Sequence, residues 1–101
     1  MDRRLSLHNL LVDTLGSSNV YFQPPESIKM KYPAIVYSRD YVDTNHANNR
    51  PYHQTDRDQI ILIDQDPDSE IIQKLKALPM CEYDRHYAAD NLNHDVFTIY
   101  Y

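Results

Sequence analysis

The first strong pattern along the chain is a helical one near its start. Leu7, Leu11 and Leu15 recur every four residues, so they share one face of a helix covering about residues 2–15. Gly16 follows the last leucine, at the position where a helix usually closes with a residue in the left-handed conformation. The pattern predicts an amphipathic helix that ends at Gly16.

Two β-prone segments come next. Val20–Phe22 is a short β-branched and aromatic run, and the two prolines at 24 and 25 end it because proline cannot donate a ladder hydrogen bond. The stretch from Tyr32 to about Val42 is longer and has the same composition. We therefore expect a short first strand and a central second strand.

Residues 43–55 interrupt this pattern with a polar composition. Asparagine and aspartate are frequent there, and a new apolar run begins only at Gln59–Asp64. We expect residues 43–55 to form a long loop that joins two strands of a hairpin.

A second helix is signalled after this apolar run. Asp66 is the expected N-cap and Pro67 the first helical residue, with further acids at the positive end of the helix dipole. The predicted buried stripe consists of Ile71, Ile72, Leu75 and Leu78. Pro79 ends this helix after roughly three turns.

Two closing strands are expected at residues 80–87 and 93–101, around a turn rich in Asp and Asn. The element order α-β-β-β-α-β-β predicts one α+β domain over residues 1–101. Its sheet should be antiparallel or mixed, with about five strands and both helices packed on one face. The last strand contains neither proline nor glycine, so we expect it to be an open edge that pairs with another chain.

The overall charge limits the possible partners. Fifteen acids against ten bases give a net charge of −5, which argues against a groove that grips duplex DNA by neutralising phosphates. A single glycine excludes glycine-rich phosphate loops, which need at least two. Nine tyrosines favour a protein with extensive interfaces.

The cysteine content and the lack of long apolar runs indicate the compartment in which the chain is expected. Cys81 is the only cysteine, so no internal disulfide can form, as is typical of a reducing compartment. No apolar run approaches the roughly 18 residues that a membrane span needs, and the start of the chain has no apolar leader segment. We therefore expect neither export nor a membrane partner.

One group of residues could bind a metal. His46 and His53 lie within sixteen residues of Asp43, Asp56 and Asp58, and imidazole with carboxylate can hold zinc. Such a site would make the chain a small metal-dependent hydrolase or nuclease. The spacing matches no common ligand pattern, and polar loops collect these residue types, so a solvated loop is the favoured interpretation.

Two other groups are better explained by structure. Asp64, Asp66 and Asp68 resemble the opening of a calcium loop, but Ser69 and Leu75 replace its glycine and its glutamate, so helix capping explains the acids better. His86 and His94 could serve acid–base chemistry, but cross-strand hydrogen bonds or an interface are favoured. The sequence predicts no catalytic residue, no metal and no cofactor.

Several segments of the chain together resemble one known protein family. They are Leu7–Gly16, Asn19–Pro25, Tyr32–Tyr37 and Asp90–Tyr101. With the element order, they resemble the small tail-completion or tail-terminator proteins of long-tailed bacteriophages.

The resemblance implies a structural role without catalysis. Family members form a homo-oligomeric ring, typically of six copies, that stops growth of the tail tube and docks onto the head connector. The expected partners are thus the chain itself, the tail tube protein and the connector or neck protein, while DNA passes through the lumen without specific binding. The expected location is the virion, and the host cytoplasm during assembly.

The resemblance also suggests contact residues. In this family the long loop reaches toward neighbours or the tube, and here it maps onto residues 41–55. The expected partner-binding residues are Asp43, His46, Asn48, Asn49, Arg50 and Tyr52. From the expected edge strand, the subunit interface should include Phe97, Ile99 and Tyr101. A head-completion or neck adaptor, and a small host-directed regulator, remain alternative roles.

Overall fold

The computed structural model describes residues 3–24, 29–47 and 50–100. For Arg3 and for residues 40–47 and 50–56, only the backbone is described. The elements are α1 (Arg3–Leu15), β1 (Val20–Phe22), β2 (Ala34–Ala47), β3 (Arg50–Asp64), α2 (Glu70–Lys76), β4 (Cys81–Ala89) and β5 (Leu92–Tyr100).

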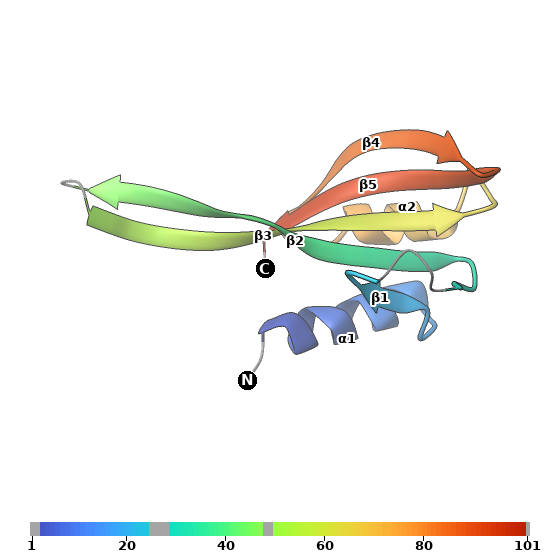
Figure 1. Cartoon of the computed structure of the whole chain (residues 1–101), viewed down its shortest axis with the longest axis horizontal. Helices are drawn as coiled ribbons and strands as arrows, with labels where there is room; N and C mark the ends of the chain where they lie inside the picture. Colours follow the sequence, from blue (N-terminus) through green and yellow to red (C-terminus); the bar gives the residue numbers. More distant parts are fainter. Residues whose placement is uncertain (1–2, 25–28, 48–49, 101) are drawn as a thin grey trace.

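The fold is α+β, as the sequence predicts. Five strands form one mixed sheet in the order β1-β2-β3-β5-β4 (Figure 1). β1 runs parallel to β2, and the other neighbouring pairs are antiparallel. The predicted order of helices and strands is confirmed.

The N-terminal helix forms as expected. Its leucine face is buried, since Leu7, Leu11 and Leu15 all belong to the hydrophobic core. Gly16 adopts a φ of 79°, and its N–H donates to the carbonyl of Val12 at 2.8 Å. This left-handed residue closes α1.

The second helix is shorter than predicted and begins later. It covers only Glu70–Lys76, and its N-cap is Ser69, whose Oγ accepts the N–H of Ile71 at 3.3 Å. Asp66 instead accepts the N–H of Asp68 at 2.9 Å in a turn before the helix. The predicted cap at Asp66 is wrong because this local side-chain to backbone bond holds a turn there.

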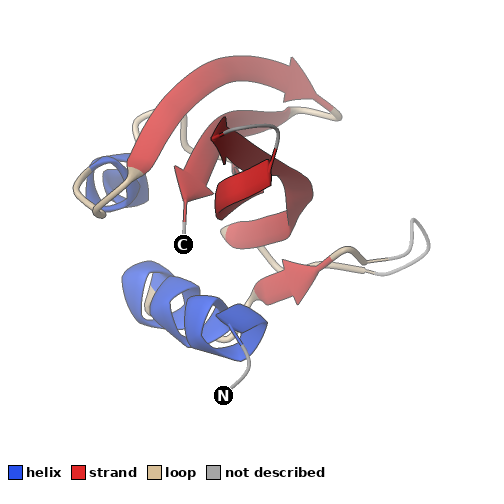
Figure 2. Ribbon diagram, turned by 90° about the vertical axis from the view of Figure 1, so that its left-hand side faces the viewer, coloured by secondary structure: helices blue, strands red, loops and turns tan. Residues whose placement is uncertain are grey.

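Both helices contribute to a core on one side of the sheet (Figure 2). The strand register sets Tyr37 beside Ile60 and Ile60 beside Phe97, so one row of large side chains crosses three strands. Leucines of α1 and Leu75 of α2 complete this cluster. The prediction that the helices share one face agrees with this packing.

The last strand is an interior strand, so its expected role as an open edge is wrong. β5 lies between β3 and β4, and β4 forms the edge. The burial pattern gives the reason: Val96 and Phe97, which point to opposite faces, are both fully buried. Residues 82–89 of β4 are all exposed, as suits an edge.

The expected loop at residues 43–55 is wrong for the described residues 43–47 and 50–55, which lie in strands. β2 and β3 remain paired from Tyr41 opposite Arg57 to Ala47 opposite Arg50, so this segment is a two-stranded hairpin. We call residues 41–57 the arm. Beyond Arg57 at its base, which pairs with Tyr100 of β5, the arm has no described neighbour strand, since the pairing with β1 ends at Tyr37.

The arm gives the molecule an elongated shape. It projects from the body along the longest axis (Figure 1), and the overall extents are 50 × 25 × 24 Å. The radius of gyration is 14.7 Å, against about 13 Å for a compact domain of this length.

Candidate interaction surfaces

The arm carries the predicted partner-binding residues that the structure describes. Asp43 pairs with Thr55, and His46 pairs with Pro51 near the tip. Arg50 and Tyr52 lie on the returning strand. Asn48 and Asn49 lie outside the described residues. The predicted residues therefore sit on a strand pair, where their backbone positions are set by the ladder.

The predicted subunit-interface residues are placed differently. Phe97 is 0% exposed and Ile99 is 1% exposed, both within the chain's own core. Phe97 also contacts the ring of Tyr83 edge to face, with 5.2 Å between centroids. These two side chains cannot contact another subunit while the chain is folded, so their assignment to the interface is wrong. Tyr101 lies outside the described residues.

The proposed metal cluster is separated by the register. His46 lies opposite Pro51, whereas Asp58 lies opposite Arg39, seven positions further along β3. Seven residues of strand span about 23 Å, far more than the roughly 2 Å metal–ligand distances of a zinc site allow. His46 and Asp58 cannot share one ion, so a single site made of both histidines and the three aspartates is wrong. Among the described side chains, no group of three metal-binding residues comes together.

The other candidate residues have structural partners. Asp64 Oδ1 accepts the N–H of Asp66 at 3.1 Å, one step before the turn at Asp66. His86 Nε2 lies 3.1 Å from the side-chain oxygen of Asn93 on the neighbouring strand. His94 stacks on Tyr87 with 4.6 Å between ring centroids. The expected cross-strand bond of His86 agrees with these contacts, whereas Asp64 and Asp66 hold turns before α2 and do not cap it.

Cys81 is half-buried against the core. Burial, and to a smaller extent the charge of Glu82, raise the pKa of its thiol to about 11. Since the thiolate is the nucleophilic form, this cysteine is a poor nucleophile near neutral pH.

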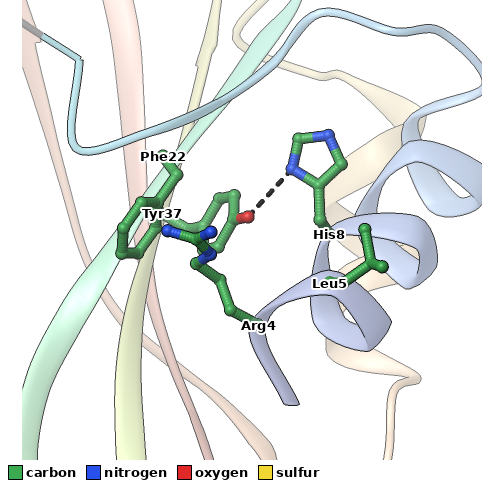
Figure 3. Close-up of a pocket in the computed structure, with 5 residues that line it drawn as sticks. All are labelled: Arg4, Leu5, His8, Phe22 and Tyr37. Carbon is green, nitrogen blue, oxygen red and sulfur yellow. Dashed lines mark hydrogen bonds between the residues drawn. The ribbon is translucent and has the colours of Figure 1, made fainter. Parts of the chain in front are cut away.

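Sequence reasoning missed a hollow between α1 and the β1 edge of the sheet (Figure 3). It has a volume of about 430 Å³. Its lining residues are Arg4, Leu5, His8, Phe22 and Tyr37. They are spread over 34 positions of sequence and no short motif links them, so only the folded chain reveals the hollow.

The hollow combines an aromatic wall with a cation. The Arg4 guanidinium lies over the ring of Phe22, 4.7 Å from its centroid. At the back of the hollow, His8 Nδ1 lies 2.8 Å from the hydroxyl of the buried Tyr37. A second hollow adjoins the first through Arg4 and Phe22, and Arg39 and Gln23 line it. Two arginines thus flank one phenyl ring.

The opposite edge of the sheet, β4, has a different character. Tyr83 is 40% exposed and Tyr87 is 39% exposed. Glu82 and Asp84 are also exposed. Tyr83 donates a hydrogen bond to Asp95 at 2.9 Å, and loss of hydration together with this bond raises the pKa of Tyr83. Asp84 forms an exposed ion pair with its neighbour Arg85 at 2.8 Å.

Charge is divided unevenly between these two edges. Residues 1–39, which build α1, β1 and the start of β2, contain five bases and three acids. Residues 40–101 contain five bases and twelve acids. The segment that contains the β1 edge is therefore basic within an acidic protein, with Arg4 and Arg39 at the hollow, and the β4 edge belongs to the acidic part.

Comparisons of the chain with known protein families and with curated protein sequences found no match. Over the described residues, the structure contains no helix long and apolar enough to cross a bilayer.

Proposed function

We propose that the chain is a structural subunit of a bacteriophage tail or neck. In this role it forms a homo-oligomeric ring of six copies that terminates the tail tube and joins it to the head connector. The resemblance of four sequence segments to tail-terminator proteins supports this role. The α+β architecture is compatible with it. The role needs no catalytic residue and no cofactor.

The observation that carries the proposal is the arm. An isolated two-stranded hairpin is marginally stable in water, and the arm has no described strand on either side. Contact with another chain would stabilise it, because unpaired strand edges are ready to pair or pack. A protruding arm of this kind suits a subunit whose work is to hold neighbours or a tube together.

The arm also agrees with the polar composition of residues 43–55. A surface that must remain soluble before assembly and form contacts afterwards is commonly polar, with tyrosine as an anchor. Tyr41 and Tyr52 occur in the arm and supply such anchors. The proposed partners are the neighbouring subunits, the tail tube protein and the connector, with DNA passing through the lumen.

Deletion of residues 45–50 tests the role of the arm. We expect the shortened chain to keep its far-ultraviolet circular dichroism and its core, because the body packs without these residues. Phage assembled with it should have tails of abnormal length in electron micrographs, and infectivity should be lost. Unchanged tail lengths with full infectivity would contradict the proposal. Lys31→Ala, an exposed site outside the arm, serves as the control.

A neck or head-completion adaptor is the second candidate role, since an arm on a ring subunit could equally reach a connector. Pull-down with tail tube protein and with portal protein separates the two. Retention of the tube protein supports a terminator, and retention of the portal protein alone supports an adaptor.

A further inference from the structure

The charges on the two edges of the sheet indicate which surfaces of two copies of the chain could contact each other. β1 and β4 are the opposite edge strands of one sheet. Arg4 and Arg39 flank the hollow beside β1, while Glu82 and Asp84 are exposed on β4. Glu82 and Asp84 share one strand, whereas Arg4 and Arg39 lie on α1 and β2 and come together only in the folded chain.

Contacts between like edges are electrostatically unfavourable. A two-fold contact of β4 with β4 would bring Glu82 and Asp84 of both copies together, and Arg85, which pairs with Asp84, offsets only part of this negative charge. A contact of β1 edges would bring the arginines together. A head-to-tail contact instead places the acids of one copy against the arginines of the next. Exposed ion pairs contribute little alone, so apolar contacts must supply most of the stabilisation.

Both edges provide such apolar contacts. Tyr83 and Tyr87 are the large exposed aromatic side chains of β4. On the other edge, Leu5 is 50% exposed and lines the hollow together with Phe22 (Figure 3). An acidic and aromatic strand is the chemical complement of a hollow that has two arginines around a phenyl ring.

We infer that the β4 edge of one copy docks onto the α1–β1 edge of the next copy, with Glu82 and Asp84 facing Arg4 and Arg39. The contact is heterologous, so each copy uses both edges, as a ring of identical subunits requires. This inference rests on the proposed ring and names its interface. Residues of β4 thus take the interface role that was predicted for Phe97 and Ile99, both of which are buried.

Two charge-reversed proteins test this contact. The first carries Arg4→Glu and Arg39→Glu, and the second carries Glu82→Lys and Asp84→Lys. We expect each alone to assemble at least about tenfold more weakly than the wild type, because its two edges now carry like charge. An equal mixture should regain oligomers containing both proteins in equal amounts, because every contact in an alternating ring then pairs opposite charges. Sedimentation velocity with one protein fluorescently labelled measures both results.

The control is Lys29→Glu with Lys31→Glu, which changes the net charge as much as the first variant. Both lysines are exposed and precede β2. Both lie before Ala34, where β2 begins, and Arg39 lies five residues further, about 17 Å along the extended strand. We expect this control to assemble like the wild type. Circular dichroism of every variant confirms that it is folded.

The possible results separate the interface from the ring. If the wild type assembles and both reversed proteins assemble equally well, the proposed contact is wrong and the ring stands. If the reversed proteins fail but their mixture does not recover, the pairing of these two edges is wrong. If the wild type stays monomeric up to millimolar concentration, both the contact and the ring are wrong.

Discussion

Truncation of Phe97 tests the finding that the last strand belongs to the core of the chain. Its side chain is fully buried, packs edge to face on Tyr83 and lies beside Ile60 in the register. Replacing a buried phenylalanine by alanine costs about 3–5 kcal/mol, which includes the cavity left behind. The lost aromatic pair accounts for about 1 kcal/mol of such a value. We therefore expect Phe97→Ala to lower the free energy of unfolding by about 4 kcal/mol.

This loss is large compared with the stability of a small domain, which is about 5–15 kcal/mol. Urea unfolding followed by circular dichroism measures the change, and Thr98→Ala on the same strand, only partly buried, is the control. The control should lose less than about 1 kcal/mol. Because the effect lies within one subunit, it should be the same at micromolar and at tenfold higher protein concentration.

An interface role for Phe97 would give a different result. In that case the effect of Phe97→Ala would depend on protein concentration and would vanish where the chain is monomeric. A loss below about 1 kcal/mol in the monomer would refute the core placement.

Three further predictions follow from local structure. Because Ser69 caps α2, Ser69→Ala should lower the free energy of unfolding by about 1 kcal/mol in urea titrations, and Asp66→Ala should lower it by less. A larger loss for Asp66→Ala would show that Asp66 is the cap. Gly16→Ala should lower the melting temperature, because a φ of 79° costs alanine about 1 kcal/mol of strain. The added carbon itself has room, since no atom lies within 4 Å of it. An unchanged melting temperature would contradict this reason. Cys81 should react with iodoacetamide at pH 8 about 100-fold more slowly in the folded chain than in urea, because its pKa rises from 9.0 to about 11; equal rates would refute the shift.

The same raised pKa fixes the direction of a pH effect on stability. Between pH 9.0 and about 11 the unfolded thiol has lost its proton while the folded thiol keeps it. Folding is therefore disfavoured as pH rises through this range. Cys81→Ser should reduce this part of the alkaline loss of stability in urea titrations at pH 8 and pH 10.

Local patterns predicted the elements that depend on neighbouring residues. The leucine spacing and Gly16 identified α1 and its end, since both signals act within one turn of helix. The short strand Val20–Phe22 followed from its composition and the prolines after it. Such signals need no knowledge of the distant chain.

Features set by distant partners were not predictable in the same way. The arm has a polar sequence, but backbone hydrogen bonds between β2 and β3 do not require apolar side chains. The position of β5 depends on its pairing with β3, whose partner residues lie 29 to 43 positions earlier. One signal was available: consecutive apolar residues at Val96 and Phe97 are typical of an interior strand, while the charged run in β4 is typical of an edge.

For the candidate surfaces too, features that depend on distant residues were not predictable from local sequence patterns. The arm residues were predicted to bind partners from their place in the chain, which stays a prediction, and their strand conformation was not predicted. The hollow beside β1 was missed because Arg4, Phe22 and Arg39 come from three separate elements. The charge difference between residues 1–39 and 40–101 was present in the sequence but had no meaning until the sheet order placed those segments at opposite edges.

The central claim is that the chain assembles into a ring, and its mass in solution tests this most directly. Light scattering over a range of protein concentrations should show the 12.0 kDa subunit converting into one discrete oligomer. A ring of six copies would have a mass of about 72 kDa by the family resemblance. A mass of 12.0 kDa at every concentration would contradict the claim.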